Sequence, residues 1–172
     1  MAGAQSTFKR TVKANINMLR GTVDDVMAFF AQRFGELDEA SYYELKVVLN
    51  ELMVNAIRHG CKNDPCRNVT VEAHLSKSGD ASVVVEDEGD GYDTLAVGEG
   101  AQCPRLGAPG GKGPECVNES GRGLAIVRSM CEHFTVNNKG NKVAVRKKLS
   151  RASGASGASG ASGASGASGA SG

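Results

Sequence analysis

The hydrophobic and polar positions of the first sixty residues predict one strand followed by two helices. Apolar and polar residues alternate over residues 8–17, which is the two-residue period of a half-buried strand. Over residues 22–34 apolar residues recur every three or four positions, with Thr22 expected at the N-cap and Gly35 after the last turn. The same spacing starts again near residue 38 and continues until Gly60, which is expected to end a longer helix.

The rest of the chain contains short strand-like runs, one short helix and one long loop. The loop, residues 95–120, is rich in glycine and proline and lacks periodicity, so we expect a lid over a ligand. In chain order the other expected elements are strands at 69–75 and 81–86, a helix at 124–131, and strands at 134–137 and 142–146. This order predicts an α+β fold, a two-layer sandwich with a mostly antiparallel β-sheet and helices on one face.

The chain divides into one folded domain with a short segment on each side. Residues 1–6 are expected to form a flexible N-terminus. Residues 151–172 are almost wholly Ala-Ser-Gly repeats, which bury too little apolar surface to offset the entropy of ordering, so we expect a disordered tail. Residues 7–150 remain as a single domain, long enough for one substantial core.

Composition and charge exclude several classes of function. Lys and Arg number 20 and Asp and Glu 19, so no basic footprint for direct nucleic-acid binding stands out. No apolar stretch is long enough to cross a membrane, and the polar start is not a secretory signal, so we expect a cytoplasmic protein. The five cysteines are an odd number without zinc-site spacing, which favours reduced thiols over disulfides or a structural zinc.

The predicted second helix carries a polar pair on its surface. Glu51 and Asn55 are four residues apart, so they lie one turn from each other on the same face. A carboxylate beside a carboxamide can orient a water and bind a hard metal ion. The plainer interpretation is a pair of solvated surface residues, and other motifs must decide between the two.

Two familiar phosphate-binding motifs are absent although glycines are plentiful. Residues 107–113 resemble a P-loop, but Gly113 stands where a Walker A motif requires Ser or Thr. The pair Gly89 and Gly91 does not continue into G-x-G-x-x-G, because Thr94 occupies the third position. The sequence therefore predicts neither a P-loop nor a Rossmann site.

A different set of residues is suited to a nucleotide. Asp87 lies at the end of a predicted strand, where its carboxylate can accept a hydrogen bond from an exocyclic amine such as that of adenine. Gly89 and Gly91 allow backbone and ligand to approach closely, because no Cβ intervenes. Gly121 and Gly123 precede a helix, whose free N–H groups favour phosphate. Each feature alone is more simply a turn or a helix entry, but together with the polar pair they favour a nucleotide site.

Three stretches of the chain resemble the nucleotide-binding boxes of the GHKL superfamily, the Bergerat-fold ATPases. They are residues 51–56 (ELMVNA), 87–91 (DEGDG) and 121–124 (GRGL). Residues 55–60 (NAIRHG) are similar to the form found in bacterial anti-sigma-factor serine kinases, the small stand-alone branch. The resemblance covers roughly residues 8–149 and implies the Bergerat ATP-binding fold.

The resemblance implies ATP and Mg²⁺ as cofactors and gives each candidate residue a role. Glu51 is expected to be the general base that takes the proton of the acceptor serine, and Asn55 to hold Mg²⁺. The residues expected to contact ATP are Asp87 at the adenine amine, Gly89 and Gly91 at the pocket floor, and Gly121, Arg122 and Gly123 at the phosphates. In the lid, Arg105 and Lys112 are assigned to the γ-phosphate from their charge alone.

The same resemblance implies a function and partners. The expected activity is that of a protein serine/threonine kinase that phosphorylates an anti-anti-sigma (STAS-type) protein on serine and binds a sigma factor as a homodimer. Two alternatives stay open. One is a non-catalytic ATP- or ADP-binding interaction module, which has no need of a base at Glu51. The other is a histidine-kinase catalytic domain, which the sequence disfavours because the chain starts directly with a strand and has no phosphoacceptor hairpin.

Overall fold

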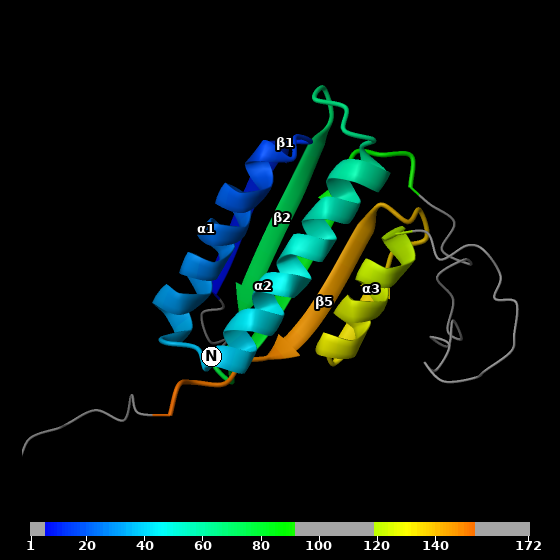
Figure 1. Ribbon diagram of the computed structural model, residues 1–172. Helices are drawn as coiled ribbons and strands as arrows, with labels where there is room; N and C mark the ends of the chain where they lie inside the picture. The colour runs from blue at the N-terminus through cyan, green and yellow to red at the C-terminus, as the bar shows by residue number, and fades with distance from the viewer. Residues whose placement is uncertain (1–5, 92–118, 154–172) are drawn as a thin grey trace, which may run out of the picture.

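The computed structural model describes residues 6–91 and 119–153, which form a five-stranded antiparallel sheet covered by helices on one face (Figure 1). The sheet order is β1-β2-β3-β5-β4, and every neighbouring pair of these strands is antiparallel. The elements are β1 (Ser6–Lys13), α1 (Asn17–Phe34), α2 (Glu39–Val54), the π-helical turn η1 (Asn55–Gly60), β2 (Asn68–Leu75), β3 (Asp80–Asp87), α3 (Glu119–Met130), β4 (His133–Val136) and β5 (Lys142–Lys148). The predicted α+β two-layer sandwich is confirmed.

The start of helix α1 differs from the prediction. The helix begins at Asn17 rather than at Thr22, because the Asn15 side chain accepts a hydrogen bond from the Asn17 backbone N–H at 2.9 Å and so initiates the first turn. Thr22 is buried inside the helix, where its hydroxyl donates to the Met18 carbonyl at 2.8 Å. Its prediction as the N-cap was therefore wrong.

Helix α2 follows its predicted pattern and then changes pitch. Asp38 caps it by accepting from the Ser41 N–H at 2.7 Å. After Val54 the chain continues as the π-helical turn η1, in which the Cys61 N–H bonds the Ala56 carbonyl five residues back. The wider turn was not predicted, because its residues suit an α-helix equally well. It brings Gly60, its last residue, to the end of β3.

The core lies between the helices and the sheet. Strands β2 and β3 alternate strictly between buried and half-buried residues, as the sequence period predicts. The apolar stripe of α2 faces them, and its buried side chains include Leu45, Leu49, Leu52 and Met53. The opposite sheet face carries polar residues in cross-strand ion pairs such as Lys9–Glu72 at 2.6 Å. In the part of the chain that the structure describes, no helix is both long and apolar enough to span a bilayer.

Candidate functional site

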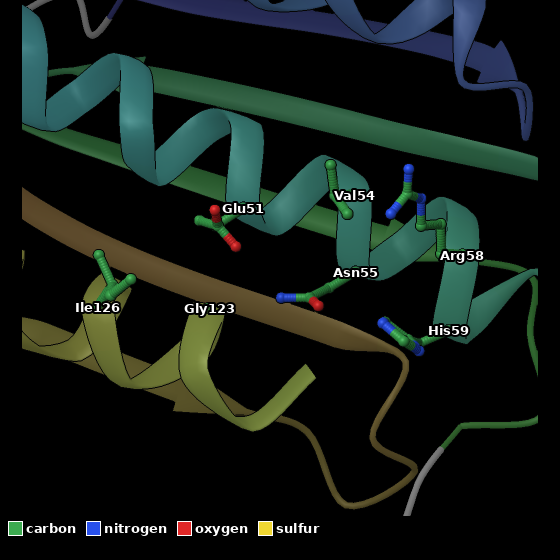
Figure 2. Close-up of a pocket in the computed structure, with 7 residues that line it drawn as sticks. All are labelled: Glu51, Val54, Asn55, Arg58, His59, Gly123 and Ile126. Carbon is green, nitrogen blue, oxygen red and sulfur yellow. The ribbon is translucent and has the colours of Figure 1, made fainter. Parts of the chain in front are cut away.

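A cavity of about 350 Å³ lies where α2 and η1 face helix α3 (Figure 2). Side chains from both walls point into it, and they come from segments about seventy residues apart in sequence. The lining residues are Glu51, Val54, Asn55, Arg58 and His59 from α2 and η1, and Gly123 and Ile126 from α3. Three of the predicted site residues, Glu51, Asn55 and Gly123, therefore share one cavity.

Gly123 allows α3 to approach the acidic residue of this cavity. A Cβ built on Gly123 would overlap Glu51 Oε2, and it would lie 3.6 Å from the Asn55 amide nitrogen. Any larger residue at position 123 must displace the carboxylate. The glycine was predicted for contact with phosphate, and the structure adds that it makes room for Glu51.

The Asn55 side chain has a polar atom that the described protein does not satisfy. Its amide nitrogen Nδ2 is buried and has no hydrogen-bond partner among the described residues. An unpaired buried donor of this kind costs about 1–3 kcal/mol, unless a ligand or water supplies an acceptor. Because this amide lines the cavity, its unmet donor is an observation that fits a polar ligand there.

Arg58 and His59 complete the polar rim of the cavity and were given no role of their own by the sequence. They follow Asn55 in η1, and Figure 2 shows both side chains near the far end of the cavity from Glu51. The sequence could have indicated them, because they follow Glu51 by seven and eight residues and so lie about two helical turns away on the same face. Their positive or polar groups suit an anionic ligand.

Asp87 occupies a second, more enclosed place at the end of β3. Its side chain is only 6% exposed, and Oδ1 accepts a hydrogen bond from the Gly89 N–H at 2.8 Å. Burial raises the pKa of this carboxyl above its ordinary value, while the Gly89 hydrogen bond and the charges of Lys139 and Arg67 act against the rise. The sequence predicted Asp87 at a strand end, where β3 has it, and the structure adds that the carboxyl is buried.

Glycines surround Asp87 because other residues do not fit. A Cβ on Gly60 would overlap the Asp87 carboxyl group, and a Cβ on Gly89 would overlap the Gly60 carbonyl oxygen. Gly91 has a φ of +82° and lies against the Lys139 carbonyl. Gly60 was missed as a site residue, since a glycine after a helix is most simply its end signal.

Asp87 does not line the cavity between α2 and α3, and η1 connects the two places. The Asn55 end of η1 faces the cavity, whereas its Gly60 end covers the Asp87 carboxyl. An elongated ligand that reaches both places must therefore pass along η1. A nucleotide, with its base at one end and phosphates at the other, has this shape.

Several predicted site features lie outside the described residues. These are the lid at 95–120 except for the first two residues of α3, and with it Arg105 and Lys112. Gly121 and Arg122 are part of α3, which begins at Glu119 and so starts earlier than the predicted 124–131. Within the described segments, no group of three His, Cys, Asp or Glu side chains is arranged to hold a metal ion.

The comparisons with known proteins agree with this fold. Residues 12–147 match the family model described as the histidine kinase-like ATPase domain. The chain belongs to this family, and its predicted GHKL resemblance is confirmed. Membership of an ATPase family implies that the ligand is ATP, which has the elongated shape expected of a ligand that reaches both places.

The similar curated proteins are more specific. The anti-sigma F factor of Shouchella clausii (strain KSM-K16) is 32% identical over 153 residues, covering 87% of this chain and 95% of the relative. The anti-sigma F factor of Geobacillus kaustophilus (strain HTA426) is 32% identical over 130 residues, covering 74% and 82%. That of Clostridium perfringens (strain SM101 / Type A) is 30% identical over 128 residues, covering 73% and 84%.

A solved structure supports the fold. The crystal structure of the RsbU and RsbW domains of Rv1364c from Mycobacterium tuberculosis superimposes with a TM-score of 0.57 at 18% sequence identity. The match covers 85% of this chain but only 32% of that longer chain. At this identity the likeness concerns the fold alone.

Proposed function

We propose that this protein is an ATP-dependent serine kinase and anti-sigma factor. It binds a sigma factor and phosphorylates an anti-anti-sigma protein of the STAS type on serine. The observation that carries this proposal is the shared cavity of Glu51, Asn55 and Gly123, connected through η1 to the buried carboxyl of Asp87. The anti-sigma F factors that match most of this chain support it.

The polar side chains of the cavity fit ATP bound together with Mg²⁺. Magnesium prefers a few protein oxygen ligands and completes its shell with phosphates and water, so a three-residue cage is not needed. The Asn55 carboxamide oxygen Oδ1 is the proposed protein ligand of Mg²⁺, and the buried Nδ2, which has no partner among the described residues, can donate to a phosphate oxygen. Mg²⁺ and ATP would supply the transferable phosphoryl group and the charge that offsets the phosphate oxygens.

The remaining roles belong to the chain. Asp87 accepts a hydrogen bond from the adenine amine, and Gly89 and Gly91 let the backbone of Gly60 and Lys139 lie close to this strand end. Glu51, half-buried at the cavity wall, would remove the proton from the acceptor serine hydroxyl while the serine oxygen bonds to the γ-phosphorus and the bond from that phosphorus to the ADP oxygen breaks. In the proposal Gly121, Arg122 and Gly123 contact the phosphates, and Arg105 and Lys112 do so from the lid.

The proposed partners are a sigma factor, a serine-bearing anti-anti-sigma protein and a second copy of this chain, and the proposed location is the cytoplasm. The anti-sigma F factors similar to this chain support the first of these partners. A pull-down from a lysate of the source organism, with and without ATP, should recover both partners. Phosphosite mapping of the recovered anti-anti-sigma protein should then find phosphoserine.

Glu51→Gln distinguishes a kinase from a nucleotide-binding module. The amide keeps the size of the side chain but removes its basicity, so ATP binding should be retained while serine phosphorylation falls by about 10²- to 10⁴-fold. Phosphorylation at the wild-type rate would contradict the catalytic role of Glu51. Phosphohistidine on the chain or its partner would instead favour the histidine-kinase alternative.

A further inference from the structure

The hairpin turn between β4 and β5 is bonded directly to the backbone of Asp87. The Asp87 N–H donates to the Asn141 carbonyl at 2.9 Å, and the Asn141 side-chain Nδ2 donates to the Asp87 carbonyl at 2.7 Å. Asn141 itself is only 8% exposed. One residue of this turn therefore holds both backbone groups of the buried aspartate.

The side chain of Asn141 replaces a backbone donor in the sheet. The register pairs Glu86 with Lys142, so Asp87 stands opposite Asn141. Between antiparallel strands, every second residue pair exchanges two backbone hydrogen bonds. The Leu149 N–H donates to the Gly79 carbonyl, so the Gly79–Leu149 pair is of this kind. Counting along the strands in steps of two, the Asp87–Asn141 pair is expected to be of the same kind. Only one of these bonds is a backbone pair here, because the second comes from the Asn141 amide.

A second asparagine explains why the backbone donor of Asn141 turns away. The Asn137 Oδ1 accepts from the N–H groups of Asn141 at 3.0 Å and Lys142 at 3.1 Å. The Asn137 Nδ2 donates to the Asn141 Oδ1 at 2.9 Å. Backbone N–H groups donate and carbonyls accept, so these partners fix the orientation of both side-chain amides. We call Asn137 and Asn141 together the asparagine clasp.

The same turn also touches the glycine segment after Asp87. Gly91 lies against the Lys139 carbonyl at a position where a Cβ would overlap that oxygen. The turn thus contacts the chain at Asp87 and again four residues later. Between these two contacts lies the Gly89 N–H that bonds the Asp87 carboxylate.

We propose that Asn141 is a positioning residue for nucleotide recognition, which holds the end of β3 so that the Asp87 carboxylate meets the base. This inference rests on the proposed function, in which Asp87 accepts a hydrogen bond from the adenine amine. Asn141 acts through the Asp87 backbone and does not itself touch the nucleotide. Loss of its amide leaves the buried Asp87 carbonyl without this donor, and the strand end is then free to shift the carboxylate.

The test compares ATP with purine riboside triphosphate, which carries hydrogen in place of the 6-amino group. Wild-type protein should bind ATP more tightly, because the second ligand offers no donor to Asp87. Asn141→Ala should weaken ATP binding by about tenfold, the equivalent of one buried hydrogen bond. Its affinity for purine riboside triphosphate should stay within about twofold of wild type, since this ligand does not use the Asp87 contact.

Two variants serve as controls for the comparison. Asn138→Ala makes the same substitution at an exposed residue of the same turn and should leave both affinities unchanged. In a double-mutant cycle, adding Asn141→Ala to Asp87→Asn should weaken ATP binding no further. The Asp87 substitution already removes the contact through which Asn141 acts. Thermal unfolding shows whether Asn141→Ala is folded. If it is not, Asn137→Ala, which keeps Asn141 itself, is compared with wild type by its ratio of affinities for ATP and purine riboside triphosphate.

The outcomes separate this inference from the proposed function. A wild-type preference for ATP that Asn141→Ala and Asn137→Ala leave unchanged would overturn the positioning role and leave the proposed function intact. Equal losses for both ligands would show a general structural role and would also overturn it. Equal binding of both ligands by the wild-type protein would overturn the adenine contact of Asp87, and with it this inference.

Discussion

The charged carboxylate of Asp87 is unfavourable for stability but favourable for binding an amine, and a single substitution can measure both effects. Burial raises the pKa of its carboxyl, so the folded protein binds a proton there more readily than the unfolded chain. The stability contributed by this site is fully present below the unfolded pKa of about 3.9 and is lost as pH rises through the higher folded pKa. The charged form is nevertheless the one that best accepts a hydrogen bond from an amine.

Asp87→Asn should therefore weaken ATP binding by about ten- to a hundredfold, the range for a hydrogen bond to a charged group. Its free energy of unfolding relative to wild type should increase as pH rises through the carboxyl range, because the variant has no buried charge to form. Calorimetric titration with ATP and denaturant unfolding at several pH values measure the two effects. An unchanged ATP affinity would contradict the adenine role.

Asp80→Asn provides a control of opposite sign. Hydrogen bonds from the Ser78 and then the Ser76 hydroxyl hold the pKa of Asp80 below its ordinary value. Its contribution to stability is present above the unfolded pKa and is lost as pH falls through the folded pKa. The stability of Asp80→Asn relative to wild type should accordingly fall as pH rises, with ATP affinity unchanged.

At the scale of helices, the site depends on how closely α3 lies to α2. Their contact combines the Gly123 approach to Glu51 with a second link at the other end of α3, where buried Lys147 pairs with Glu44 of α2. The Lys147 ammonium also donates to the Met130 carbonyl at 3.0 Å, at the C-terminus of α3. Strand β5 thereby fixes α3 relative to the helix that carries Glu51.

Gly123→Ala should separate catalysis from folding. The new Cβ overlaps the flexible end of the Glu51 side chain, so the carboxylate moves while the backbone stays in place. Replacing glycine inside a helix contributes about 1 kcal/mol to stability, which offsets the crowding. We expect a melting temperature close to wild type and serine phosphorylation reduced at least tenfold, the scale of a misplaced base.

Gly21→Ala is the matched control for this substitution. Gly21 is the fifth residue of α1, as Gly123 is of α3, and a Cβ there meets nothing within 4 Å. It should raise the melting temperature slightly and leave phosphorylation unchanged. If Gly123→Ala phosphorylates as fast as Gly21→Ala, the crowded contact with Glu51 does not matter for catalysis.

The sequence predicted those parts of the site that local patterns specify. Alternation placed Asp87 at a strand end, and helical spacing placed Glu51 and Asn55 on one face, as the structure has them. It did not reveal Gly60 or Asn141, because both meet Asp87 through pairings between distant segments. Residues 138–141 only join two predicted strands in the sequence, and the adjacency of β3 and β5 that gives Asn141 its contact is a property of the whole sheet.

At the scale of the whole molecule, the fold could be predicted because nearly every element has a strong period. The exceptions have physical causes. The π-helical turn η1 uses the same residue types as an α-helix, and the early start of α1 depends on one asparagine side chain. The C-terminal boundary was placed at residue 151 from composition, yet Arg151 and Ala152 contact the body of the domain.

Residues 150–152, which follow β5, contact the end of α1, the segment that joins it to α2, and the start of α2. The Asp38 N–H donates to the Ser150 carbonyl at 3.0 Å, and the Ser150 N–H donates to the Ser41 hydroxyl at 3.0 Å. The Arg151 guanidinium lies 5.0 Å from the centroid of the Phe34 ring, and the Ala152 N–H donates to the Glu36 carbonyl at 3.1 Å. The two hydrogen bonds of Ser150 stabilise the cap of the helix that carries Glu51 and leads into Asn55.

Two truncations of the chain should therefore behave differently. Deleting residues 154–172 removes Gly154 and six Ala-Ser-Gly repeats, whose small side chains bury little apolar surface, and should leave the melting temperature and ATP affinity unchanged. Deleting residues 150–172 also removes the hydrogen bonds at the start of α2 and should cost about 1–3 kcal/mol of stability, measured by denaturant unfolding. Equal stability of the two truncated proteins would show that residues 150–153 do not hold α2. A loss of stability in the shorter deletion alone would assign a structural role to the repeats, because each of the contacts above remains in that protein.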